Sequence, residues 1–148
     1  MKELKGKIIK EIYLNEDKEI MVFKTIDNEV ISYQTKNDCC NVVWFETWEN
    51  LDILSNYKVN RIIEIPMREV DPTRGDSVEE VYGHRLETNK GYALIEYRNN
   101  HNGYYGGTIE FTNYKYSDKE LKRFRKIFEA SNRAHNEDID DRFELMDI

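Results

Sequence analysis

One loop in this sequence gathers side chains that suit ligand recognition. Residues 99–107 read NNHNGYYGG and directly follow the alternating segment 92–98, YALIEYR. Arg98 can bind an anion such as a phosphate, and Asn102 can hydrogen-bond to a base or ribose edge. A strand that ends in such a loop holds these groups on a rigid support. The pattern therefore favours a recognition surface over a catalytic centre.

The same loop supplies rings and turns. The faces of Tyr104 and Tyr105 can stack on a flat ligand. Gly103 follows an asparagine and Gly106 precedes another glycine, which indicates two tight turns whose backbone amides can cradle an anion. A plain turn, with the tyrosines packed on a sheet edge, explains the same residues equally well. Both interpretations stay open from the sequence.

Catalytic and metal-binding patterns are missing from the sequence. It contains no phosphate-binding loop, dinucleotide fingerprint or nucleophile elbow, and its three histidines are not spaced as metal ligands. His101 could act as a base, with Glu96 or Glu110 as its acidic partner. Glu96, however, lies on the same strand face as Arg98, and pairing with that arginine suits charge balance better. We therefore expect no enzyme activity, no metal and no cofactor.

Length and charge narrow the class of protein further. The chain has 148 residues, a formal net charge of −7, and 34% charged residues, which fits one well-solvated globular domain. An acidic protein repels the phosphates of duplex nucleic acid, so we expect no such partner. No apolar run approaches a membrane span and no signal-peptide core is present, which predicts a cytoplasmic protein. The adjacent Cys39 and Cys40 are expected to be buried thiols.

The elements that position the loop are mainly strands. Alternating apolar residues and turn signals predict antiparallel strands, a helical turn over 51–54, and an apolar segment over 38–48 that fits either a strand or a turn. The fold class predicted is α+β, a mainly antiparallel sheet with a C-terminal helix. The expected strands are 7–14, 19–24, 29–34, 59–65, 80–87, 92–98 and 108–114.

Three segments complete the organisation. Residues 66–77, which contain both prolines, are expected to form a long loop. Ser117 and Glu120 form a capping-box pattern that opens a helix over 117–133, with Leu121, Phe124 and Phe128 on one stripe and a basic face opposite. We predict one ligand-binding domain over residues 1–135, followed by an acidic tail over 136–148.

The motifs also resemble a known family. Asp38-Cys39-Cys40, the run Thr88-Asn89-Lys90-Gly91-Tyr92 and the run Asn102-Gly103-Tyr104-Tyr105-Gly106-Gly107 are similar to those of phage and prophage Thoeris anti-defence sponges and their uncharacterised relatives. The resemblance extends over residues 6–114. The loop over 66–77 and the basic C-terminal segment make this chain longer than the smallest members.

The resemblance implies a function without turnover. Such proteins bind cyclic ADP-ribose isomers made by TIR-domain proteins and keep them from their effector, and some relatives also bind cyclic oligonucleotides at separate sites. They assemble as dimers or hexamers with the ligand near the protomer interface. The matching ligand-binding positions here are Tyr92 and Asn102, with Arg98 as a further candidate. Residue type alone adds Arg61, Arg123 and Arg125 for the pyrophosphate.

A different class of function fits the acidic charge. Clustered carboxylates in the tail, together with Trp44 and Trp48, could cover a basic surface of a host defence enzyme, as nucleic-acid mimics do. Deletion of residues 136–148 would abolish such inhibition and leave a sponge intact. A nucleotide-cleaving enzyme is the other alternative, and it would release an altered ligand where a sponge returns the ligand unchanged.

Overall fold

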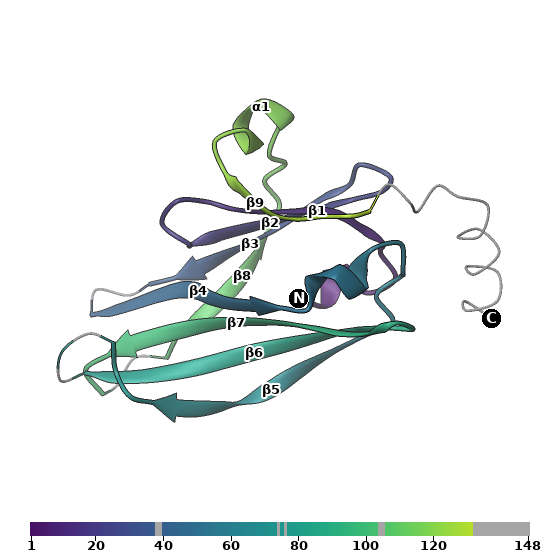
Figure 1. Cartoon of the computed structure of the whole chain (residues 1–148). Helices are drawn as coiled ribbons and strands as arrows, with labels where there is room; N and C mark the ends of the chain where they lie inside the picture. Colours follow the sequence, from purple (N-terminus) through teal and green to yellow (C-terminus); the bar gives the residue numbers. More distant parts are fainter. Residues whose placement is uncertain (38–39, 74, 76, 104–105, 132–148) are drawn as a thin grey trace.

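The computed structural model describes residues 1–37, 40–73, 75, 77–103 and 106–131, whose strands form two stacked antiparallel sheets (Figure 1). The first sheet has the strand order β8-β3-β2-β1-β9, and the second has the order β4-β7-β6-β5. The predicted fold class is confirmed, because antiparallel strands dominate and the helical elements are short. The strands are β1 (Ile9–Leu14), β2 (Ile20–Thr25), β3 (Val30–Lys36), β4 (Asn41–Glu49), β5 (Arg61–Val70), β6 (Val78–Thr88), β7 (Gly91–His101), β8 (Thr108–Thr112) and β9 (Arg125–Glu129). The helical elements are the 3-10 turns η1 (Lys2–Leu4) and η2 (Leu51–Leu54) and the α-helix α1 (Asp118–Leu121).

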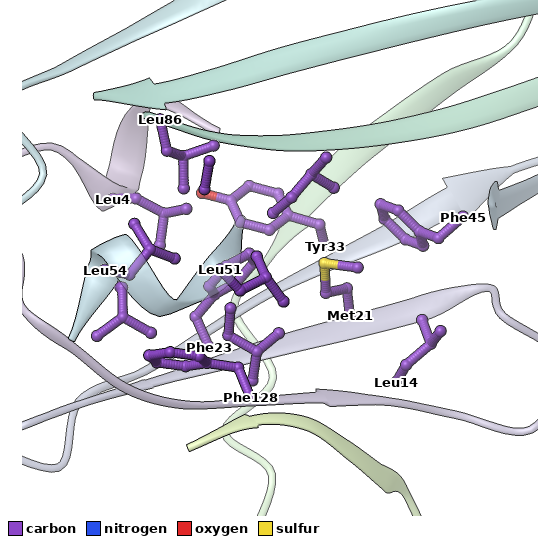
Figure 2. Packing of buried hydrophobic residues seen from close by; sticks show 14 of the residues in the cluster. Leu4, Leu14, Met21, Phe23, Tyr33, Phe45, Leu51, Leu54, Leu86 and Phe128 are labelled. Carbon is purple, nitrogen blue, oxygen red and sulfur yellow. The ribbon is translucent and has the colours of Figure 1, made fainter. Parts of the chain in front are cut away.

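The hydrophobic core lies between the two sheets. Strand alternation turns every second side chain inward, so residues such as Phe23 and Ile12 of the first sheet are fully buried opposite one another in register. Tyr33 of β3 and Leu86 of β6 enter the same interior from the two sheets (Figure 2). Leu54 of the predicted helical turn is also fully buried in this cluster. The side chains that alternate with these buried residues lie on the outer faces of the sheets, where they can contact a ligand.

Two segments form more strand than the sequence indicated. The ambiguous apolar segment is strand β4, which pairs with β7. The expected loop over 66–77 is wrong in its first part, because Pro66 and the residues up to Val70 continue β5. Proline is tolerated there because β5 is an edge strand, where a missing amide donor breaks no pairing.

The predicted C-terminal helix is corrected to one helical turn followed by a strand. Its capping box is present: the Ser117 hydroxyl accepts from the Glu120 amide at 3.2 Å, and the Glu120 carboxylate accepts from the Ser117 amide at 2.9 Å. The helix nevertheless ends at Leu121, and β9 pairs with the free side of β1. Phe128 lies opposite Ile12 and is 8% exposed. Pairing with an open strand edge satisfies backbone groups and buries Phe128, which overrides the local helical pattern.

One side of the two-sheet stack is closed by backbone contacts. The amide of Phe45 on the edge strand β4 donates to the carbonyl oxygen of Lys18, in the turn between β1 and β2, at 2.8 Å. The amide of Val43 donates to the Asn37 side chain at 3.0 Å. These bonds tie the edge of the second sheet to the first sheet, while the free edges of β5 and β8 lie on the other side.

Two further expectations concern surface and solvent. Cys40 is exposed, so the expectation of a buried thiol at that position is wrong. Within the described residues, no helix has the length and apolar character needed to cross a membrane. The predicted acidic tail, Cys39, Tyr104 and Tyr105 lie outside the described residues.

Candidate functional site

An exposed cluster of charged and aromatic side chains lies on the outer face of the second sheet. Strand register places Arg61 of β5, Glu87 of β6 and Tyr92 of β7 in one row across the sheet. Arg85 lies two residues before Glu87 and therefore on the same face. These four residues, Arg61, Arg85, Glu87 and Tyr92, are called the Tyr92 cluster.

The geometry of the Tyr92 cluster is set by one shared carboxylate. Arg61 Nε lies 3.0 Å from Glu87 Oε1, and Arg85 Nη2 lies 2.8 Å from Glu87 Oε2. The Arg85 guanidinium carbon lies 4.9 Å from the centre of the Tyr92 ring. The hydrogen bond from Arg61 is the main cause that lowers the pKa of Glu87 below its usual value. Two cations and one carboxylate leave this patch positive on an acidic protein.

The cluster is open to solvent and can therefore bind a ligand without rearrangement of the core. Tyr92 is 50% exposed, and the side chain of Arg61 is 66% exposed. A ring face beside a guanidinium suits a flat base, and two arginines suit a pyrophosphate. The carboxylate of Glu87 can accept from a ribose hydroxyl. These are the chemical groups of a nucleotide.

Arg98, in contrast, is held by a buried carboxylate. Glu79 is fully buried and lies 2.7 Å from Arg98 Nη1. It also accepts from Asn100 at 3.1 Å and from the amide and hydroxyl of Thr73 at 3.0 and 2.8 Å. Burial acts to raise the pKa of Glu79, but these hydrogen bonds outweigh it and lower that pKa to about 2. Arg98 thus neutralises Glu79 in place of contacting a phosphate.

The expected pairing between Glu96 and Arg98 is wrong. Glu96 instead lies 3.0 Å from Arg68 Nη1, because the Arg68 side chain reaches from the edge strand β5 past β6 to β7. Glu110 on β8 pairs with Lys36 at 2.8 Å. Neither carboxylate is the partner of His101, so both acidic partners considered for it from the sequence are wrong.

The structure supplies a different carboxylate for His101. His101 Nε2 lies 3.2 Å from Glu80 Oε1, on the inner face of β6 and β7. The Tyr82 hydroxyl donates to the same Glu80 oxygen at 2.9 Å, and His101 Nδ1 accepts from the Gly103 amide at 2.8 Å. His101 is 6% exposed, so this network anchors the start of the loop beneath the surface. Sequence reasoning missed Glu80 because only the pairing register brings it to His101.

The glycines of the loop have definite geometric roles. Gly103 has a φ of +119°, a backbone region that side chains with a Cβ rarely adopt. A Cβ on Gly107 would lie 2.4 Å from the Cβ of the fully buried Asn99, whereas Gly106 has open space around it. Asn102 is exposed directly after β7. The loop therefore begins on a fixed base and presents Asn102 to solvent.

The predicted ligand-binding residues do not form one site within a single chain. Tyr92 and Asn102 are ten residues apart along β7, a separation of roughly 33 Å for an extended strand. Arg125 belongs to the other sheet, with its guanidinium 5.8 Å from the Trp48 ring, and Arg123 borders a small cavity beside Tyr116. Of the predicted residues, Arg61 and Tyr92 come together. Arg98, Asn102, Gly103 and Gly106 lie at the opposite end of β7.

A sequence signal for the missed members of the cluster exists. If the turn over 88–91 is taken as a tight hairpin, the register places Glu87 opposite Tyr92 and Arg85 one step further along the same face.

Among the described residues, no group of three histidine, cysteine or acidic side chains gathers as a metal site.

Fold and surface together define a protein class: a two-layer antiparallel β protein with an exposed arginine–tyrosine patch on one outer face. Residues 2–111 match the family model described as a domain of unknown function (DUF7448), and the chain belongs to this family. The match ends within β8, so α1 and β9 lie outside it. Searches of the curated proteins and of the solved structures found no significant match.

Proposed function

We propose that this protein is a phage-type anti-defence protein that binds a cyclic nucleotide immune signal, a cyclic ADP-ribose isomer, and sequesters it in the host cytoplasm without turnover. The Tyr92 cluster is the observation that carries the proposal. It presents an exposed ring, two guanidiniums and one carboxylate within a few ångströms of each other. Tight sequestration at a nanomolar constant requires about 12 kcal/mol, which stacking and charge-assisted hydrogen bonds in a preformed site can supply.

The site is proposed to form between two copies of the chain. Tyr92 and Asn102 are too far apart to contact one nucleotide in a single protomer. A twofold axis that runs two β7 strands past each other would bring Tyr92 of one copy to Asn102 of the other, twice per dimer. The exposed apolar residues Val42 and Met67, on the two edge strands of the second sheet, offer apolar surface for such a contact.

The direct test is calorimetry of the purified protein against cyclic ADP-ribose isomers, with cyclic di- and trinucleotides as a second panel. The proposal expects saturable binding and recovery of the unaltered ligand after heat denaturation. Tyr92→Ala and Asn102→Ala should each abolish binding, while circular dichroism remains unchanged. Unchanged affinity in either variant would refute the site, and no binding in both panels would refute the function.

Mixing the two variants tests whether the site is shared. In a mixed dimer, one site combines both substitutions, and the other combines the intact Tyr92 with the intact Asn102. Random co-assembly of Tyr92→Ala and Asn102→Ala chains should therefore restore about one quarter of the wild-type sites, since half of the dimers are mixed. If both residues acted within one chain, the mixture would bind nothing.

One observation favours an enzyme as the second candidate. His101 Nε2 lies 3.2 Å from a Glu80 carboxylate oxygen that also accepts from the Tyr82 hydroxyl, and a histidine beside a carboxylate is a common acid–base pair. In that case the ligand would be returned cleaved, and His101→Asn would stop cleavage while binding persists. Recovery of intact ligand from the wild-type protein decides against this candidate.

A further inference from the structure

The two sheets leave a cavity on their open side. It has a volume of about 390 Å³ and lies between the edge strands β5 and β8. Its apolar walls are Tyr33, Ile62, Ile109 and Phe111. This size falls within the range of small-molecule sites in proteins.

The cavity exists because inward-facing residues are not covered there. Phe111 lies opposite the buried Tyr33 in register, and Glu64 lies opposite the buried His84, so all four turn toward the interior. Phe111 is nevertheless 42% exposed, and the side chain of Glu64 is 88% exposed. The two sheets are joined at β4 but remain apart between β5 and β8. This part of the interior is open to solvent.

His84 brings an unsatisfied polar group to this cavity. Its side chain is 7% exposed, and Nδ1 is buried without a hydrogen-bond partner. Nε2 lies 3.8 Å from Glu64 Oε1, which is longer than a direct hydrogen bond. Burial lowers the pKa of His84 to about 4, so the ring is neutral near pH 7 and keeps one donor and one acceptor. With its proton on Nε2, the ring presents a donor beside Glu64, and a ligand acceptor placed there makes the hydrogen bond that the 3.8 Å contact does not make.

We propose that this cavity is a second binding site, for a small planar heterocycle that carries a hydrogen-bond acceptor beside a donor, such as a nucleobase or another cyclic amide. The acceptor of the ligand takes the hydrogen of His84 Nε2, and the donor of the ligand binds the Glu64 carboxylate. His84 Nε2 and Glu64 Oε1 lie 3.8 Å apart. The ring packs between Ile109 and Phe111. The Tyr92 cluster lies on the opposite face of β5 and β6, so the two sites are separate.

The test uses uracil and hypoxanthine as probes and benzene as the apolar control. Chemical-shift changes of the full-length protein are followed by NMR during titration, with attention to His84, Ile109 and Phe111. The proposal expects saturable shifts with the two heterocycles and at least tenfold weaker binding of benzene. Equal affinity for benzene would overturn the hydrogen-bonding role, and the absence of any saturable shift would overturn the site.

Two variants separate the polar and apolar contributions. Glu64→Leu changes an exposed side chain, so the fold is retained, and heterocycle binding should weaken roughly tenfold because a charged acceptor is lost. Ile109→Trp should fill the cavity and abolish binding, with a thermal melt to verify folding. Glu29→Leu is the matched control, because Glu29 is a carboxylate that pairs with Lys7 and does not line the cavity, and it should leave heterocycle binding unchanged. Full affinity in Glu64→Leu, or loss of binding in Glu29→Leu, would contradict the assignment.

Discussion

Removal of the charge of Glu79 tests how the loop end of β7 is stabilised. Glu79→Gln keeps the shape of the side chain but replaces one acceptor oxygen with a donor group. The new amide would face Arg98 or Thr73, both of which donate to Glu79. A buried charge whose partner is removed typically costs about 3–5 kcal/mol. We expect a loss of about 3 kcal/mol in the free energy of unfolding.

The pH dependence gives the same magnitude independently. The pKa of Glu79 falls from 4.5 to about 2 on folding, and a shift of this size corresponds to about 3 kcal/mol. Because the folded pKa is depressed, this stabilisation is present above pH 4.5 and is lost as the pH falls toward 2. The difference in stability between wild type and Glu79→Gln should therefore shrink across that interval.

Urea denaturation of both proteins at several pH values between 2 and 7 measures this effect. Glu87→Gln serves as the control, because Glu87 also pairs with two arginines but lies at the surface, so its loss should be much smaller. The reasoning is refuted if Glu79→Gln is as stable as Glu87→Gln at pH 7. A stability difference that does not change with pH would refute the assigned ionisation.

Three further predictions concern other parts of the fold. Gly107→Ala should lose about 1–3 kcal/mol by overpacking against Asn99, whereas Gly106→Ala should lose far less, as thermal melts of both will determine. Ser117→Ala removes a helix cap and should cost about 1 kcal/mol in urea denaturation; no loss would show that α1 does not depend on its cap. His84 has a pKa lowered from 6.5 to about 4, so its neutral form stabilises the fold above pH 6.5 and about 3 kcal/mol is lost toward pH 4. His84→Gln should lack this decline, and an identical pH profile would contradict it.

The strands near the candidate site were predictable because their periodicity and turns are local. Alternation over 92–98 and the turn before it place Tyr92 at the start of β7 on a hairpin, as observed. The pairing of Arg61 with Glu87 was not predictable from the same signals. It depends on which strand lies beside β6, and that choice is made by packing between distant segments.

The segment after α1 shows a different limit of sequence patterns. Leu121, Phe124 and Phe128 fit a helical stripe, yet Phe128 reaches the core from a strand. A short apolar pattern is compatible with both periods, and the open edge of β1 decides between them. In the same way, Arg98 could not be recognised as the partner of Glu79, because only the fold buries that carboxylate.

The closed edge of β4 bears on behaviour at high concentration. An unpaired edge strand invites an identical strand from another molecule, which leads to aggregation. In β4, the outward amides of Val43 and Phe45 are already bonded within the chain. On the opposite edge, Pro66 and an irregular register interrupt β5. The proposed sequestering function would require the protein to accumulate to the level of its ligand, and a sheet whose two edges resist strand addition favours a dispersed protein at that concentration.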